Sequence, residues 1–361
     1  MQEMVLPTKA GKDDAESSLP VCIIGGGGLG LALAATLCRG GSRVTLVCRP
    51  GSEPALRQRG NVKVSGATVA RVELTDVAVA LESVRLSPDP AEAWASEAVL
   101  LTVKGPDLFG LAAHLAQRAS SSGEATYFVG FQNGVVKDEV LVRALGARRV
   151  VGGATVLGCE RLEAGSVVVS GLGATFLGEF SGKGSARVAR LTAAFSSAGL
   201  PVRVEQDIRS LLWTKFCHAI GVFGVSALTG LPSYDIFSRP SLAHAYLSLL
   251  AEAAAVAAKE KVVINDFLDL PISTNLRLSA DEAVAGMVER AGPRPSGRPG
   301  FSSMAQDLAS QRPTEVEETF GDLARRASLH GLAVPRTDLV YRVVRGRQEG
   351  YSTSDSRGAS D

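Results

Sequence analysis

The stretch Val21-Cys-Ile-Ile-Gly-Gly-Gly-Gly-Leu-Gly30 runs directly into Leu-Ala-Leu-Ala-Ala at residues 31–35. Apolar residues, then glycines, then an alanine-rich segment indicate a buried strand, a tight turn and the start of a helix. Gly25 can turn without the steric cost of a Cβ, and Gly30 allows the helix to pack close to its strand. We therefore expect a strand-turn-helix unit at the start of the fold.

The spacing Gly25-x-Gly27-x-x-Gly30 is the pattern of turns that bind dinucleotides. In such turns Gly27 lets the backbone approach a pyrophosphate, and the N–H groups at the helix start, here Gly28, face the phosphates. A glycine-rich hairpin or linker is the alternative interpretation. The strand before the glycines and the helix after them favour a cofactor-binding turn that contains Gly25, Gly27, Gly28 and Gly30.

Composition narrows the class of protein. The 361 residues are enough for two domains, and 45% hydrophobic with 21% charged residues predicts a folded, soluble chain. With 38 basic and 37 acidic side chains, the net charge of +1 gives no reason to expect a nucleic-acid or membrane partner. The five scattered cysteines predict reduced thiols and no metal site, and the acidic residues before the first strand argue against a targeting peptide. We expect a cytoplasmic protein with a small-molecule ligand.

Apolar strands alternate with helical segments from residue 20 onward, which predicts a mostly parallel, doubly wound sheet of the Rossmann type. Two β-rich runs within residues 166–179 predict a hairpin around residues 170–173. The expected strands lie at residues 21–24, 43–47, 98–103, 126–129, 149–151 and 201–205, and the expected helices at residues 31–39, 108–118 and 187–198.

The alternation of strands and helices ends near residue 207, and the residues beyond it show a predominantly helical pattern. The predicted organisation is a disordered tail (1–19), a dinucleotide-binding domain (20–206), an all-α substrate domain (207–351) and a second disordered tail (352–361). The apolar segment 216–232 is expected to be a buried helix. Ser303-x-x-Gln306 and Thr314-x-x-Glu317 match the capping box that begins many helices.

The position just after the second strand favours one form of the cofactor. No Asp or Glu lies between residues 43 and 52, where an acidic side chain normally binds the ribose of NAD, while Arg49 is present. A guanidinium can bind a 2′-phosphate with two hydrogen bonds, so the sequence favours NADP. An ordinary solvated arginine is the alternative.

Polar residues also follow the next two strands. Lys104 closes residues 98–103, and Asn133 follows residues 126–129. Open α/β sheets bind ligands at the carboxyl ends of their strands, so we expect both residues near the cofactor, and Asn133 also near the substrate. For Asn133, followed by Gly134, a simple turn is the alternative.

Taken together and in order, these segments resemble the ketopantoate reductase family, the NADPH-dependent 2-dehydropantoate 2-reductases. The resemblance runs from residue 21 to about residue 351. The matching segments are Gly25-x-Gly27-x-x-Gly30, Arg49, Val103-Lys104, Gln132-Asn133-Gly134, Asp207-Ile-x₄-Trp213-x-Lys215, Ser303-Met-x-Gln306-Asp307 and Thr314-Glu315.

The resemblance implies roles for four residues of the second domain. Lys215 matches the general acid that protonates the carbonyl oxygen of a 2-oxo acid, and Glu315 matches a carboxylate that binds the substrate hydroxyl. Ser303 matches a substrate-binding serine, and Asp307 is expected to hold the substrate or Ser303. Each has a structural alternative: a lysine extending from a buried helix, an acid in a first helical turn, a helix cap, or an ordinary polar contact.

The chain departs from the family pattern on the helix of Lys215. Four and eight residues beyond the lysine the family carries asparagines that hold the substrate, whereas this chain has Ala219 and Phe223. His218 could supply a replacement hydrogen-bond donor, although a lone histidine on an apolar helix is more often a core residue. Arg294 or Arg298 in the Pro/Gly/Arg-rich segment 291–300 could bind a carboxylate.

The sequence therefore predicts NADPH-dependent reduction of a 2-oxo acid, with 2-dehydropantoate and pantothenate biosynthesis as the first hypothesis. A related reductase acting on a larger, less polar ketone or 2-oxo acid is the alternative, because of Ala219 and Phe223. A non-catalytic NADP-binding module is an alternative of another class, and an opine- or imine-type dehydrogenase is a third. A homodimer is compatible with the sequence.

Overall fold

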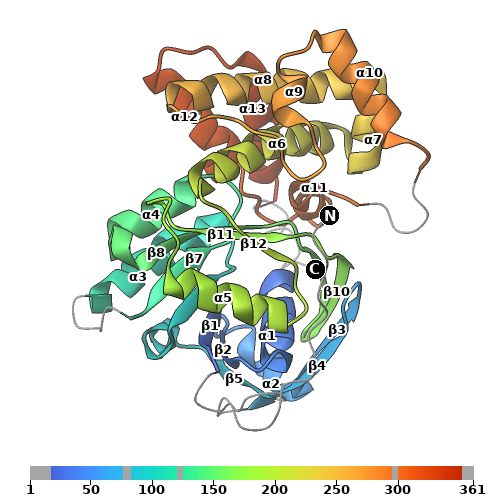
Figure 1. Ribbon diagram of the computed structural model, residues 1–361. Helices are drawn as coiled ribbons and strands as arrows, with labels where there is room; N and C mark the ends of the chain where they lie inside the picture. Colours follow the sequence, from blue (N-terminus) through green and yellow to red (C-terminus); the bar gives the residue numbers. More distant parts are fainter. Residues whose placement is uncertain (1–17, 76–82, 120–124, 295–299, 352–361) are drawn as a thin grey trace. The chain divides into compact units, whose positions relative to one another are not determined.

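The computed structural model describes residues 18–75, 83–119, 125–294 and 300–351 (Figure 1). Both predicted disordered tails fall mainly or wholly outside these residues. The chain forms two units. The first holds most of residues 18–208, and the second holds residues 209–351 together with the short segments 104–106 and 133–137. Lys104 and Asn133 therefore group with the second unit.

A single sheet organises the first unit. Among the described residues it contains twelve strands in the order β12-β11-β8-β7-β6-β1-β2-β5-β4-β3-β10-β9. Their bounds are β1 Pro20–Ile24, β2 Arg43–Val47, β3 Asn61–Gly66, β4 Ala70–Thr75, β5 Ser83–Ser87, β6 Ala98–Leu101, β7 Tyr127–Gly130, β8 Val150–Thr155, β9 Gly158–Glu163, β10 Ser166–Gly171, β11 Thr175–Gly178 and β12 Val202–Val204.

The pairing is parallel at the centre, where β7, β6, β1, β2 and β5 run side by side. Antiparallel pairs occur at β3/β4, β8/β11 and β9/β10. The helices of this unit are α1 Gly28–Arg39, α2 Glu53–Arg59, α3 Gly105–Ala119, α4 Val136–Leu145 and α5 Ala186–Ser197, with 3-10 turns η1 Pro90–Ala95 and η2 Ala147–Arg149. The predicted α/β class with a parallel sheet is confirmed.

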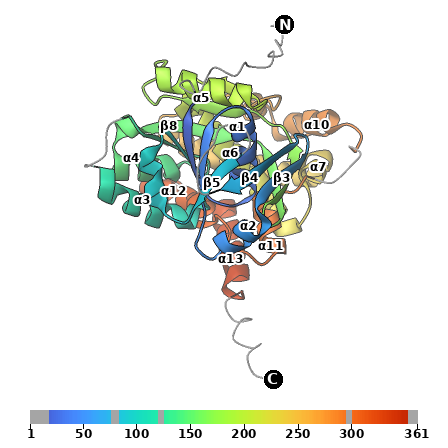
Figure 2. The same ribbon diagram turned by 90° about the horizontal axis from the view of Figure 1, so that it is seen from below.

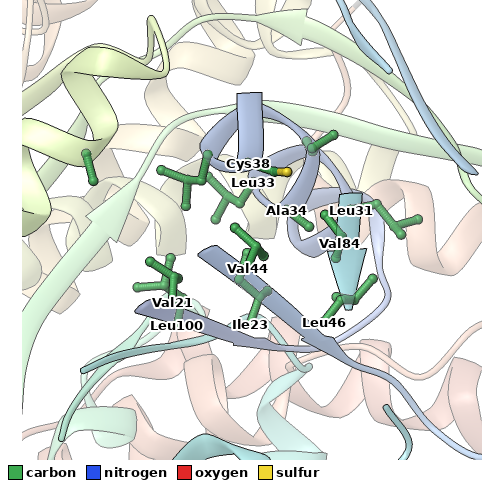
Figure 3. Packing of buried hydrophobic residues seen from close by; sticks show 14 of the residues in the cluster. Val21, Ile23, Leu31, Leu33, Ala34, Cys38, Val44, Leu46, Val84 and Leu100 are labelled. Atoms are coloured by element: carbon green, nitrogen blue, oxygen red, sulfur yellow. The ribbon is translucent and has the colours of Figure 1, made fainter. Parts of the chain in front are cut away.

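Two hydrophobic cores cover the two faces of this sheet. Strand β1 alternates between them, because successive side chains point to opposite faces: Val21 and Ile23 join the core that contains α1 (Figure 3). Cys22 and Ile24 join the other core, which contains residues of α3 and α4. In both ribbon views α3 and α4 lie on one side of this unit, with β3 and β4 on the other (Figures 1 and 2).

The predicted hairpin within residues 166–179 is wrong. β10 and β11 are consecutive in the chain, yet β10 pairs with β9 and β3 while β11 pairs with β8 and β12. The hairpin is instead β9–β10, whose turn contains Gly165 in a left-handed conformation at φ +68°. α1 packs against β2, β3, β4, β9 and β10, so this part of the sheet curls around the helix.

The second unit is helical, as the sequence predicts. Its helices are α6 Ile208–Thr229, α7 Ser233–Ser238, α8 Pro240–Lys259, α9 Ile272–Asn275, α10 Ala280–Ala291, α11 Ser303–Ala309, α12 Asp322–Leu329 and α13 Pro335–Glu349, with a π-helical turn η3 at Glu317–Gly321. By length and composition alone, α6 and α8 could cross a membrane, but 78% of the apolar window of α6 and 50% of that of α8 are buried inside the structure. That burial is typical of a core helix in a soluble protein.

Candidate active site

The glycine-rich turn is closely packed at its two ends. Gly25 has φ +132°, and a Cβ there would lie 2.6 Å from Thr102 Oγ1. A Cβ on Gly30 would lie 1.8 Å from the carbonyl oxygen of Gly25. The Gly25 amide donates to the Val47 carbonyl at 2.8 Å, which ties the turn to the end of β2. Side chains are therefore excluded at both ends, and the turn has a fixed shape.

The middle of the turn is open. A Cβ on Gly27 would meet nothing within 4 Å. Gly27 is also the N-cap of α1, and no side chain caps this helix end. The first N–H groups of a helix seek acceptors and carry the positive end of the helix dipole. The open space at Gly27 thus fits the pyrophosphate of a dinucleotide, as the motif predicts. Gly28, by contrast, packs against β9.

Arg49 lies just beyond β2 with a largely exposed side chain. Its guanidinium forms an ion pair with Asp107 in the first turn of α3. A 2′-phosphate bound at Arg49 would have to share or displace that carboxylate. Asp107 lies 58 residues beyond Arg49, and no sequence pattern indicates the contact.

A line of hydrogen bonds links the predicted catalytic residues within the second unit. Lys215 Nζ donates to Asn133 Oδ1 at 3.2 Å, and Asn133 Nδ2 donates to Glu315 Oε2 at 2.8 Å. The other carboxylate oxygen, Oε1, accepts the Gly105 amide at 3.1 Å. Asn133 therefore joins the ammonium to the carboxylate, and Glu315 is buried and held at both oxygens.

Lys215 has an altered proton affinity. Burial and, to a smaller extent, the positive charge of Lys137 lower its pKa, Glu315 opposes them, and the net result is a pKa of about 8. The ordinary value is 10.5. Such a lysine is still mostly protonated at neutral pH but gives up its proton far more readily than a surface lysine.

Asp307 is buried in α11 and carries two cationic partners. Lys104 forms an ion pair with Oδ2, and Arg312 Nε donates to Oδ1 at 3.2 Å. Lys104 is thus held by Asp307 in this structure. Asn133 Nδ2 lies 3.5 Å from Ser303 Oγ, a long hydrogen bond that brings Ser303 beside the line from Lys215 to Glu315.

Both predicted capping boxes are wrong. α11 is capped by Ser302, whose Oγ accepts the Ala305 amide at 3.2 Å and lies 2.5 Å from Ser226 Oγ. The hydroxyl of Ser303 is therefore not used as the helix cap. At the second position, Thr314 Oγ1 is buried without a hydrogen-bond partner among the described residues, and the helical turn begins only at Glu317.

His218 is packed among aromatic side chains, one of which supplies its hydrogen-bond partner. Its Nδ1 lies 2.9 Å from the Tyr246 hydroxyl, and its ring stacks on Phe237 with centroids 6.2 Å apart. Burial, together with the charge of Lys215, lowers its pKa to about 4, so the ring is neutral at pH 7. The positions of the family asparagines, Ala219 and Phe223, are buried at 7% and 9% exposure.

Glu318 is a further buried carboxyl that the sequence analysis did not single out. Its Oε2 has no hydrogen-bond partner within the part of the chain that the structure describes. A Cβ on Gly105 would lie 2.8 Å from Glu318 Cδ, and a Cβ on Gly134 would lie 2.4 Å from the Glu318 carbonyl oxygen. Burial, followed by the charges of Glu315 and Glu317, raises its pKa to about 7. A run of acidic residues at positions 315, 317 and 318 was the available signal.

Arg294, one of the two arginines considered as carboxylate ligands, has other partners in the structure. Arg294 pairs with Asp235 and lies over the Tyr234 ring, 4.8 Å from its centroid. Arg298 lies outside the described residues. The structure therefore brings together Lys215, Asn133, Glu315 and Ser303, and it places Lys104 with Asp307.

Comparison with known families gives two adjacent matches. Residues 21–182 match the family model described as ketopantoate reductase PanE/ApbA. Residues 207–348 match the model of the C-terminal region of the same family. The second match begins at the change from α/β to helical structure, and residues 183–206 lie between the two matches.

Individual relatives cover nearly the same span. A 2-dehydropantoate 2-reductase from Halobacterium salinarum is 28% identical over 90% of this chain and 97% of its own. One from Archaeoglobus fulgidus is 26% identical over 91% of this chain and 98% of its own.

Solved structures show the same fold. A PanE/ApbA family ketopantoate reductase from Ralstonia eutropha is similar with a TM-score of 0.71 at 23% identity, over 92% of this chain and 99% of its own. A D-mandelate dehydrogenase with NADH and anilino(oxo)acetate has a TM-score of 0.73 at 19% identity, over 92% of this chain and 99% of its own. A dimeric ketopantoate reductase from Staphylococcus aureus has a TM-score of 0.64 at 18% identity, over 92% of this chain and 99% of its own.

Proposed function

The chain belongs to the ketopantoate reductase family of NADP-dependent oxidoreductases, and we propose that it reduces a 2-oxo acid to a 2-hydroxy acid, with 2-dehydropantoate as the first candidate substrate. The observation that carries the proposal is the line from Lys215 through Asn133 to Glu315. It combines a readily released proton, which reduction of a carbonyl group requires, with a fixed carboxylate that can bind a substrate hydroxyl. Reduction of 2-dehydropantoate would place the enzyme in pantothenate biosynthesis.

In this proposal Lys215 is the general acid. When bound, the reduced nicotinamide supplies a hydride to the carbonyl carbon. The carbonyl oxygen then gains negative charge, and the Lys215 ammonium donates a proton to it. A pKa of about 8 suits this task, because an acid works best when its pKa lies near the working pH. Asn133 holds the ammonium through its side-chain oxygen.

Glu315 and Ser303 bind the substrate in this scheme. Both Glu315 oxygens already accept hydrogen bonds, from Asn133 and from the Gly105 amide, so its carboxylate is fixed before substrate arrives. It can accept a further bond from a substrate hydroxyl. Ser303, free of a capping role, offers a donor for the substrate carboxylate. Asp307 acts as a positioning residue that orients Lys104.

NADPH is the cofactor we propose. The family uses a nicotinamide cofactor, the turn at Gly27 has room for a pyrophosphate, and the position after β2 carries Arg49 in place of an acid. Arg49 and the dinucleotide-binding turn both belong to the first unit. Replacing Arg49 by alanine should weaken NADPH binding much more than NADH binding.

A larger, less polar ketone or 2-oxo acid is the second candidate substrate. Ala219 and Phe223 offer no hydrogen bonds where the family has asparagines, and His218 is neutral and bonded to Tyr246, so it does not replace them. A site that lacks such donors discriminates less strongly in favour of a hydroxylated substrate. The D-mandelate dehydrogenase of the same fold was solved with the aromatic oxo acid anilino(oxo)acetate.

A substrate screen separates the two candidates. Purified enzyme is assayed with NADPH against 2-dehydropantoate, an aliphatic branched 2-oxo acid and an aromatic 2-oxo acid, and kcat/KM is compared. Ala219→Asn provides the matched variant. If 2-dehydropantoate is the natural substrate of the wild-type chain, it is reduced at least as efficiently as the others. If the second candidate is correct, the apolar acids are preferred and Ala219→Asn shifts the preference toward 2-dehydropantoate.

Replacing Lys215 by alanine tests catalysis itself and distinguishes a reductase from a non-catalytic binding module. We expect kcat to fall by a factor of about 10²–10⁴, the usual contribution of general acid–base catalysis. The dissociation constant of NADPH should change little, since in this proposal the glycine turn and Arg49, both of the first unit, bind the phosphates of the cofactor. Unchanged turnover in this variant would contradict the mechanism, and absence of turnover in the wild type on every 2-oxo acid would favour the binding module.

The partners we propose are small molecules. The near-zero net charge gives no attraction to nucleic acid or anionic membranes, and we propose a cytoplasmic location. A relative of the same fold is a dimer. We propose a homodimer for this chain as well, which sedimentation equilibrium would test.

A further inference from the structure

Strand β9 brings a second arginine to the glycine-rich turn. Arg161 Nη1 donates to the Gly26 carbonyl at 3.4 Å. Its backbone nitrogen lies 3.1 Å from the place where a Cβ on Gly28 would stand. The whole arrangement lies within the first unit. β9 therefore forms a wall beside the turn, and the guanidinium of Arg161 projects from that wall to the turn itself.

The Arg161 guanidinium is held only weakly. Its side chain is exposed, and within the described part of the chain it forms no ion pair. A single long hydrogen bond to a carbonyl oxygen is a weak restraint. An arginine in that state can rebind to an incoming anion without losing an existing ion pair, unlike Arg49, whose guanidinium contacts Asp107.

The turn itself is short of positive charge. Residues 25–30 are five glycines and a leucine, so no side chain of the motif carries a charge. The N-terminus of α1 supplies only the equivalent of about half an elementary charge. A pyrophosphate carries negative charge on both phosphates, and a guanidinium fork matches phosphate oxygens in geometry as well as in charge.

We propose that Arg161 is a binding residue for the pyrophosphate of the nicotinamide cofactor. The inference rests on the proposed function only in that the cofactor is a dinucleotide. It assigns different tasks to two arginines: Arg161 binds the part that NAD and NADP share, while Arg49 binds the 2′-phosphate that distinguishes them. Arg161 would exchange its bond to the Gly26 carbonyl for bonds to phosphate oxygens.

The test is calorimetric titration of the full-length protein with NADP⁺, NAD⁺ and adenosine 2′-monophosphate, which lacks the pyrophosphate. For Arg161→Gln we expect the dissociation constants of NADP⁺ and NAD⁺ to rise together by about tenfold, the effect of losing a charge-assisted contact. Binding of adenosine 2′-monophosphate should stay within about twofold of the wild type. Arg161→Lys keeps the charge and should recover part of the loss.

Two control variants make the result specific. Arg71→Gln, on β4, removes the same charge from an exposed arginine of the same sheet and should leave the dissociation constants of all three ligands unchanged. Arg49→Ala should weaken NADP⁺ and adenosine 2′-monophosphate but not NAD⁺. The proposal is overturned if Arg161→Gln binds NADP⁺ as tightly as the wild type, or if Arg71→Gln loses as much affinity for NADP⁺ as Arg161→Gln does.

These titrations also separate the inference from the proposed reaction. An enzyme that binds NADP⁺ through Arg161 but reduces no 2-oxo acid would overturn the proposed function and leave this inference standing. The converse result, full turnover with unchanged binding in Arg161→Gln, would overturn the inference alone.

Discussion

At the scale of single residues, the chemistry of Lys215 depends on its surroundings more than on its identity. Burial and Lys137 lower its pKa, and Glu315 limits the shift. The residue type and its apolar helix could be recognised in the sequence. The contribution of Lys137 could not, because residues 137 and 215 meet only in the folded chain.

The pH dependence of the reaction follows from this lowered pKa. The general acid must be protonated for carbonyl reduction, so kcat/KM should be level below about pH 8 and fall about tenfold per pH unit above it. The measurement is a pH profile of reduction with a parallel titration of NADPH binding, which should stay constant over this range. A break near the ordinary lysine value of 10.5 would mean that Lys215 is not perturbed.

Glu318 should make the fold less stable as pH rises. Its pKa is raised from 4.5 to about 7 in the folded chain, so the stability it contributes is complete below pH 4.5 and is lost as pH rises through 7. Glu318→Gln removes the buried charge. We expect the variant to be more stable than the wild type by roughly 1–3 kcal/mol near pH 8, the cost of an unsatisfied buried group, and nearly equal to it near pH 4.5.

Urea unfolding at the two pH values checks this prediction. Glu317→Gln is the matched control, since that half-exposed neighbour accepts hydrogen bonds from Tyr341 and should give no gain at high pH. The same stability difference for Glu318→Gln at both pH values would show that its ionisation is not the cause.

At the scale of elements, the strand-turn-helix at residues 20–39 carries two separate requirements for glycine. Gly30 has no room for a side chain because the Gly25 carbonyl is too close. Gly27 has room but lies where a ligand is expected. The sequence motif contains both glycines, but it does not show that one is required for packing and the other for ligand binding.

Alanine substitutions at these two positions should therefore behave differently. Gly30→Ala forces the helix from its strand and should cost about 1–3 kcal/mol of stability or more. Gly27→Ala should change stability by about 1 kcal/mol or less, yet weaken NADP⁺ binding because its methyl group occupies the open space. Urea unfolding without cofactor and NADP⁺ titration measure the two effects. If Gly27→Ala binds NADP⁺ normally, the open space is not the phosphate site.

The sequence indicates that helices are present near residues 303 and 314, but it does not give the residues at which they begin. The capping-box pattern pointed to Ser303, but Ser302 caps α11. Adjacent serines have the same capping ability, and the bond to Ser226, 76 residues away, favours Ser302. At Thr314 a π-helical turn replaces the expected regular start, and such turns occur frequently at functional sites.

At the scale of the whole molecule, short segments of the N-terminal half belong to the second unit. Residues 104–106 and 133–137 group with residues 209–351, and they bring Gly105 and Asn133 to Glu315. Both strand ends are predicted from the sequence to bind ligands. Lys104 is predicted to lie near the cofactor, and in the structure it forms an ion pair with Asp307.

The sequence by itself determined the α/β class, the glycine turn and the change to helices after residue 207, and it named Lys215 and Glu315 as the candidate catalytic residues. Those features depend on local periodicity, on backbone freedom or on motif order, all of which lie along the chain. Only the tertiary structure decided that β9 and β10 form the hairpin, that Arg49 meets Asp107 and that Arg161 reaches Gly26. The two arginine interactions join residues 58 and 135 positions apart. The first depends on the order of the parallel strands, which places the ends of β2 and β6 on either side of β1, and the second on the packing of β9 against α1; no local pattern encodes either.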